Sequence, residues 1–145
     1  ALLAIFNTAS EVGFGNTVKL LPGFQTIRDW VFLVSPRVLI SEATAVNVLA
    51  GITGSASGGL SIALDVMGQR YLELAQAQGI SPELLHRVAA MASGGMDTLP
   101  HNGAVITLLA ITGLTHRQSY ADIFAITLLK TGTVFGLALV VSFVG

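Results

Sequence analysis

The sequence contains no cysteine and few charged residues. Without cysteine, the chain has no disulfide, no thiolate metal site and no cysteine nucleophile. Only 10% of the 145 residues are charged, whereas a soluble globular domain carries about 25%. The net charge of −1 provides no electrostatic footprint for nucleic acid. A soluble enzyme domain and a nucleic-acid-binding protein are therefore both disfavoured.

Apolar residues and glycine dominate what is present. Hydrophobic residues make up 52% of the chain and the mean hydropathy is +0.75, which excludes a disordered protein. The 16 glycines would be costly in soluble helices but are common in membrane helices. We therefore predict an all-α integral membrane protein, a bundle of several spanning helices. Because the sequence begins at Ala1 and ends at Gly145 inside an apolar run, we expect it to belong to a longer protein.

The first long apolar segment has a polar centre. The interval between Glu42 and Asp65 holds 22 uncharged residues, and a spanning helix needs about 20. Its centre, residues 51–59, contains four glycines and three hydroxyl side chains. Unwound backbone at membrane depth is tolerated where it is buried in protein or lines a wet cavity. The pattern predicts two half-helices, residues 37–50 and 60–76, that meet at a break near residues 51–61.

A second interrupted helix follows. The sequence Ser81-Pro82-Glu83 predicts a helix start, with a serine cap, proline in the first turn and an early acid. Proline disfavours helix at the residue before it and removes a backbone donor, so Pro100 favours a break over residues 93–103. An apolar run resumes directly afterwards. Residues 119–145 are then long enough for a tilted terminal span.

Two interrupted helices in one stretch are typical of secondary transporters, in which half-helix N-termini face anionic substrates. The first amides of a helix lack internal partners and attract anions. Glycines let the backbone approach a ligand, and hydroxyl groups donate hydrogen bonds. We expect a substrate site at the breaks, formed by Gly54, Ser55, Ser57, Gly58, Gly59, Ser93, Thr98 and Asn102. The alternative is that the small residues only serve tight helix packing.

Charged and titratable groups near the second break suggest coupling to protons. A carboxylate and an imidazole at membrane depth are costly, so Asp97 and His101 are candidates for carrying a proton. Alternatively, Asp97 caps the following half-helix and His101 satisfies backbone groups at the break. Lys130 lies about 15 Å into the terminal segment, as an anion-attracting charge or counter-ion. Its alternative role is snorkelling of a long side chain toward the membrane surface.

The remaining motifs provide no sign of enzymatic chemistry. The three histidines are scattered and lack the spacing of a zinc site. No phosphate-binding glycine signature with lysine and no serine elbow occurs. We therefore expect no cofactor, no bound metal and no enzyme activity.

The two glycine-rich stretches carry a family resemblance. Residues 51–64 read GITGSASGGLSIAL and residues 93–103 read SGGMDTLPHNG. Both resemble signature stretches of the gluconate:proton symporter (gluconate permease) family, and the likeness continues through residues 122–127. It is strong over residues 45–131 and weak over the first 40.

The resemblance implies a multi-pass transporter of the bacterial inner membrane that imports gluconate, or a related sugar acid or hydroxy-carboxylate, together with protons. It also implies the ion transporter superfamily fold, in which two inverted repeats contain re-entrant hairpins and broken helices. Residues 1–145 would then be the C-terminal fragment of one transport domain. Its partners would be a small organic anion, protons, membrane lipid and the N-terminal half of the transporter. The oligomeric state stays open, including a homo-oligomer.

The sequence departs from related carriers at the hairpin tips, and two functions other than symport stay open. Related dicarboxylate carriers place Ser-Asn-Thr at their hairpin tips, whereas this chain has Ser55-Ala56-Ser57 at the first break and Ser93-Gly94-Gly95 at the second. Their sodium sites are therefore not transferred to it. A passive organic-anion channel and a structural membrane subunit are the alternatives to a symporter.

Overall fold

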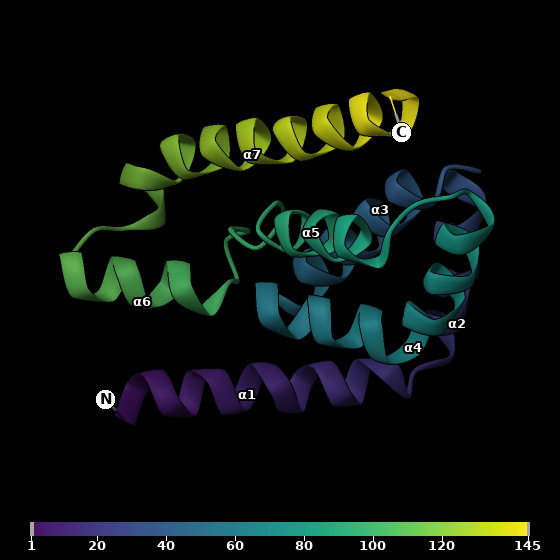
Figure 1. The fold of residues 1–145 in the computed structure, drawn as a ribbon. Coiled ribbons are helices and arrows are strands. Elements are labelled where there is room, and N and C mark those ends of the chain that lie inside the picture. The colour runs from purple at the N-terminus through teal and green to yellow at the C-terminus, as the bar shows by residue number, and fades with distance from the viewer. Residues whose placement is uncertain (1, 145) are drawn as a thin grey trace.

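The computed structural model describes residues 2–144, and these form seven helices and no strand (Figure 1). The predicted all-α class is therefore confirmed for the described residues. The helices are α1 (Leu2–Lys19), α2 (Pro22–Val34), α3 (Val38–Thr53), α4 (Ala56–Ala77), α5 (Pro82–Ser93), α6 (Gly103–Thr112) and α7 (His116–Val144).

A tight turn joins α3 and α4 into a helical hairpin. Gly54 adopts a left-handed conformation with φ of 63°, which glycine tolerates without the penalty that a Cβ would bring. Ser55 then caps α4, because its Oγ accepts a hydrogen bond from the Gly58 amide at 3.2 Å. Two residues therefore suffice to reverse the chain between the two arms.

The two arms of the hairpin touch at backbone level. A Cβ at Gly59 would overlap the backbone nitrogen and Cα of Ala50 on α3. Only glycine permits this approach, as in the small-residue contacts of membrane helices. Gly59 therefore belongs to the packing contact between the two arms of the hairpin.

Helix α3 lies at the centre of the molecule. It packs against α1, α2, α4, α5 and α7, and most of its residues are buried, including Leu39, Val46 and Leu49. A helix that is buried on every side is an interior helix. The polar side chains of α3 consequently lie inside the protein and require partners there.

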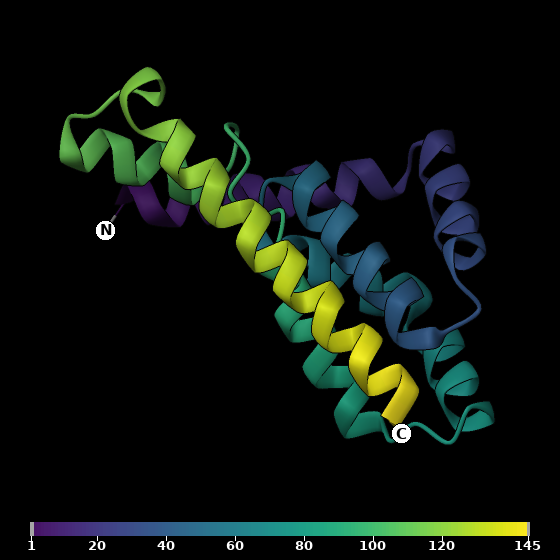
Figure 2. The same ribbon diagram turned by 90° about the horizontal axis from the view of Figure 1, so that it is seen from above.

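The chain after α5 is not helical until α6 begins. Residues 94–102 form turns, and α6 then extends away from the hairpin toward the N-terminal end of α1 (Figure 1). Helix α7 runs back across α3 and α5 (Figure 2). The break after α5 is thus enclosed between the α3–α4 turn and the first half of α7.

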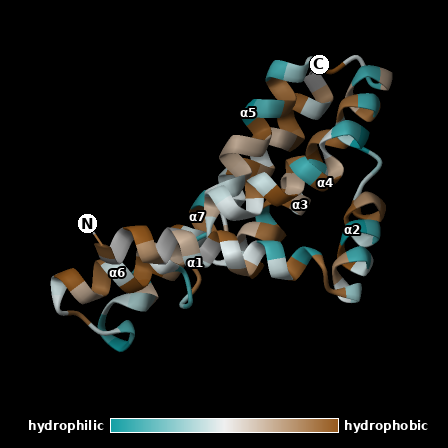
Figure 3. Ribbon diagram, turned by 90° about the horizontal axis from the view of Figure 1, so that it is seen from below, coloured by the Kyte–Doolittle hydropathy of each residue, from teal (hydrophilic) through white to brown (hydrophobic). Residues whose placement is uncertain are grey.

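Much of the apolar surface is uncovered. Leu129 on α7 is 71% exposed and Ile111 on α6 is 78% exposed, and Figure 3 shows hydrophobic residues along much of α6. Among the described residues, one helix is long and apolar enough to cross a membrane, His116–Phe143, and its most apolar stretch of 18 residues has a mean hydropathy of 1.9. Helices α3 and α6 are apolar but shorter. At 16 residues, α3 rises about 24 Å, less than the roughly 30 Å of a bilayer core.

Candidate functional site

The two non-helical breaks touch each other. The Asn102 Nδ2 group donates a hydrogen bond to the Gly54 carbonyl oxygen at 2.6 Å. His101 Nε2 lies 2.9 Å from the Gly51 carbonyl oxygen. A Cβ at Gly54 would lie 2.9 Å from the His101 ring. The chain after α5 is therefore seated directly on the turn of the α3–α4 hairpin.

Asn102 also starts helix α6. Its Oδ1 accepts hydrogen bonds from the amides of Ala104 at 2.7 Å and Val105 at 3.1 Å. These amides belong to the first turn and lack partners within the helix. One buried side chain thus caps α6 with its oxygen and holds the hairpin turn with its nitrogen.

Helix α7 contacts the other side of the second break. Lys130 Nζ lies 3.0 Å from Asp97 Oδ1, and both side chains are partly exposed. Thr98 and Thr127 hydrogen-bond through their hydroxyl groups. These contacts fix the break between α3 on one side and α7 on the other, so Asp97 lies beside a counter-charge.

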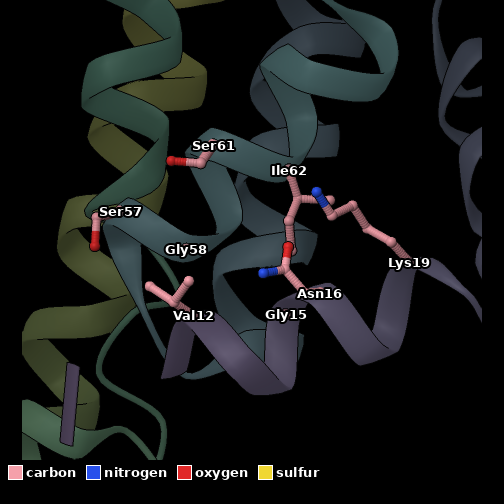
Figure 4. A pocket seen from close by; sticks show the side chains of 8 residues that line it. All are labelled: Val12, Gly15, Asn16, Lys19, Ser57, Gly58, Ser61 and Ile62. Carbon is pink, nitrogen blue, oxygen red and sulfur yellow. The ribbon is translucent and has the colours of Figure 1, made fainter. Parts of the chain in front are cut away.

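A cavity opens beside the hairpin turn, between α1 and the first turns of α4 (Figure 4). Its volume is about 170 Å³, less than the roughly 300 Å³ of a small drug site. The lining side chains that can form hydrogen bonds are Asn16, Lys19, Ser57 and Ser61. The N-terminus of α4 and the Lys19 ammonium favour a negative group at this position.

Lys19 already has one acidic neighbour. Its Nζ lies 2.9 Å from Asp65 Oδ2, and the Asp65 side chain is largely exposed. Exposed ion pairs of this kind are worth about 0–1 kcal/mol. An anion in the cavity can therefore compete for Lys19 at modest cost.

The predicted substrate residues divide among three environments. Ser57 and Gly58 line the cavity. Ser55 is buried, with its Oγ 3.3 Å from that of Ser57 in addition to its bond with the Gly58 amide. Ser93 is buried at the end of α5, where its hydroxyl donates to the Ala90 carbonyl at 2.8 Å. The break residues Gly54, Thr98 and Asn102 contact neighbouring backbone or hydroxyl groups as described above.

Sequence reasoning missed several polar groups near the breaks. Asn16, Lys19 and Ser61 line the cavity, but they lie on helices whose faces sequence alone does not pair. Asn47 on α3 donates to the Ala92 carbonyl at 3.1 Å and lies where a Cβ on Gly95 would be. Its isolation in an apolar helix was an available signal, because a buried amide needs hydrogen-bond partners.

The chain is similar to a protein called "Uncharacterized transporter YxjC" from Bacillus subtilis (strain 168). The two are 57% identical over all 145 residues of this chain. The chain spans 31% of the length of that relative, whose name specifies neither a substrate nor a coupling ion. The chain matches no family model. It matches no solved structure either.

Proposed function

We propose that the chain is part of the transport domain of a proton-coupled importer in the bacterial inner membrane. The solute is gluconate or a related sugar acid or hydroxy-carboxylate, as in the gluconate permease family, and transport proceeds by alternating access. The observation that carries the proposal is the contact between two helix breaks through Asn102 and Gly54. The 57% identity to a protein named as a transporter supports it, as does the exposed apolar surface of α7.

The solute carboxylate binds at the N-terminus of α4 in this proposal. Free amides of the first turn and the Ser57 hydroxyl donate to its oxygens, and Lys19 supplies positive charge. Asn16 and Ser61 line the same cavity and bind solute hydroxyl groups. The cavity receives the acid end of the solute, and the rest extends toward the second break and the part of the transporter outside this chain.

Asp97 or His101 carries the proton. Protonation of Asp97 forms an O–H bond at the carboxylate and leaves the Lys130 ammonium without its partner, which favours entry of an anion. Loss of that proton restores the ion pair and disfavours the bound anion. Binding of a proton and of an anion thereby assist each other, which is the thermodynamic requirement for symport.

Uphill uptake tests the proposal. Membrane vesicles that contain the full-length protein receive an inward proton gradient and radiolabelled gluconate, hydroxybutyrate or D-serine, with and without a protonophore. We expect accumulation of at least one solute above its outside concentration, and its loss with the protonophore. Equilibration without accumulation would identify a passive channel, and no movement of any solute would support a structural subunit.

Replacement of Asp97 tests the coupling residue. We expect Asp97→Asn to abolish proton-driven accumulation while the protein still folds, because the neutral amide cannot take up a proton. Folding is checked by the elution profile and melting temperature in detergent. The matched control is Asp122→Asn, on the exposed surface of α7, with uptake unchanged. Wild-type accumulation in Asp97→Asn would remove Asp97 from the mechanism.

A further inference from the structure

A carboxyl group lies inside the protein, and one of its oxygens is unpartnered among the described residues. Glu42, in the second turn of α3, is 1% exposed. Its Oε2 atom has no hydrogen-bond partner within the described part of the chain. None of the four ion pairs formed by the described residues includes it. An ionised carboxylate in such a place is costly unless it is paired. The ionised form of Glu42 would therefore destabilise the fold.

Glu42 lies in the wall of a cavity. The cavity holds about 320 Å³ between α3, α4 and α5. Gln69 on α4 and His86 on α5 line it and are exposed, so they connect the cavity to the surface. The remaining lining is mainly apolar. The cavity therefore leads from the surface to the buried carboxyl group, past the imidazole of His86.

Among the described residues, no cation on the helices around α3 forms an ion pair with Glu42. On α1, Lys19 pairs with Asp65 of α4 at 2.9 Å. From α4, Tyr71 is the nearby titratable group, and its hydroxyl hydrogen-bonds to Ser41. From α5, it is His86. On α2, Arg28 and Asp29 pair with each other at 2.8 Å. The charges on α7 are Arg117, Asp122 and Lys130, of which Lys130 pairs with Asp97.

We propose that Glu42 is a proton-binding site of the transport cycle, reached from the surface through the cavity between α3, α4 and α5. The inference rests on the proposed function and adds a site to it. A proton passes from water at His86 to a Glu42 carboxylate oxygen, where an O–H bond forms and the charge is cancelled. When the bundle changes conformation, the same O–H bond breaks and the proton returns to water on the other side.

This site differs from Asp97 in its electrostatics. In the proposed function, protonation of Asp97 breaks its ion pair with Lys130. Glu42 has no such pair, and burial alone favours its neutral form. Because α3 packs against five other helices, a change in the charge of Glu42 changes the free energy of the packing between α3 and those helices. Ionisation of Glu42 would favour any arrangement that lets water reach it, and protonation would favour the arrangement described above, in which Glu42 is buried.

The test compares accumulation with exchange in vesicles that contain the full-length protein. The probe is whichever radiolabelled solute the wild type accumulates, with the membrane potential clamped at zero. Each symported proton raises the accumulation limit about tenfold per unit of pH gradient. We expect Glu42→Gln to lower that limit at least tenfold per pH unit while solute counterflow, which needs no net proton movement, continues. Glu42→Asp restores part of the accumulation.

Glu73→Gln is the matched control, because Glu73 is an exposed glutamate on α4. Its accumulation should equal that of the wild type. Unchanged accumulation in Glu42→Gln would overturn the inference. Complete loss of accumulation with normal counterflow would support it and make Glu42 the main coupling site.

A second measurement needs no solute. Infrared difference spectra of the purified protein, recorded between two pH values, should contain a carbonyl band of a protonated carboxylic acid that Glu42→Gln removes and Asp97→Asn retains. If the wild type accumulates none of the solutes, the proposed function fails. The band still shows whether Glu42 binds a proton, because it does not depend on transport. Absence of the band in a folded wild type would overturn the inference.

Discussion

The side chain of Asn102 joins parts of the chain that lie 48 residues apart. It performs two tasks with two different atoms, since its oxygen caps α6 and its nitrogen binds the Gly54 carbonyl. A serine could supply the cap but could not reach both partners in the same way. The amide is therefore the chemical group that fixes the distance between the two breaks.

Asn102→Ala should destabilise the protein markedly. Loss of the cap costs about 1 kcal/mol, and leaving the buried Gly54 carbonyl unpaired costs about 1–3 kcal/mol more. The melting temperature in detergent measures this. Asn102→Asp retains the capping oxygens but places a carboxylate against the carbonyl, so it should cap α6 yet separate the breaks. Asn102→Ala with the melting temperature of the wild type would show that the two breaks do not depend on this contact.

Several individual residues could be foreseen from the sequence, but their partners could not. Polar residues in an apolar context identified Asp97, His101 and Asn102 as unusual, because each is costly in a membrane. The contacts of Asn102 with Gly54 and of Lys130 with Asp97 depend on how separate helices pack. In the sequence, Glu42 marks only the edge of an apolar interval, because a single acidic residue has the same appearance there whether it lies at a surface or in a core.

At the scale of helices, glycine has two different uses in this chain. Gly54 supplies the left-handed turn that ends α3. Gly58 and Gly59 lie inside α4, in a stretch whose glycine content had suggested a longer break. Composition cannot separate a glycine that ends a helix from one that lets two helices touch. For this reason the predicted start of the second half-helix at residue 60 is wrong. Helix α4 begins at Ala56, and the turn before it is shorter than predicted.

Gly59→Ala should weaken the hairpin. The new methyl group would overlap the backbone of Ala50, and overpacking of this kind costs typically about 1–3 kcal/mol. Gly68→Ala on the same helix is the control, because its Cβ would meet only Leu64 at 3.9 Å and alanine favours helix by about 1 kcal/mol. We expect a lower melting temperature for the first variant and an equal or higher one for the second. The reverse order would show that the two arms do not pack as described.

At the scale of the whole molecule, large apolar side chains are exposed to an extent unusual for a soluble protein. The interior contains Glu42, Asn47 and Asn102, while large hydrophobic side chains of α6 and α7 are exposed. Exposed apolar area of this extent marks contact with lipid or with further protein.

The position of α7 can be measured with single cysteines, since this chain contributes none of its own. Leu129 lies 13 residues after His116, about 20 Å along the helix, and so near the middle of a bilayer core. In vesicles whose protein has its other cysteines replaced by serine, Leu129→Cys should resist a membrane-impermeant maleimide and react after denaturation in detergent. Gln118→Cys, near the start of the helix, should react without denaturation. Equal and rapid labelling at both positions would place α7 in water, and the membrane location proposed for the chain would lose its main support.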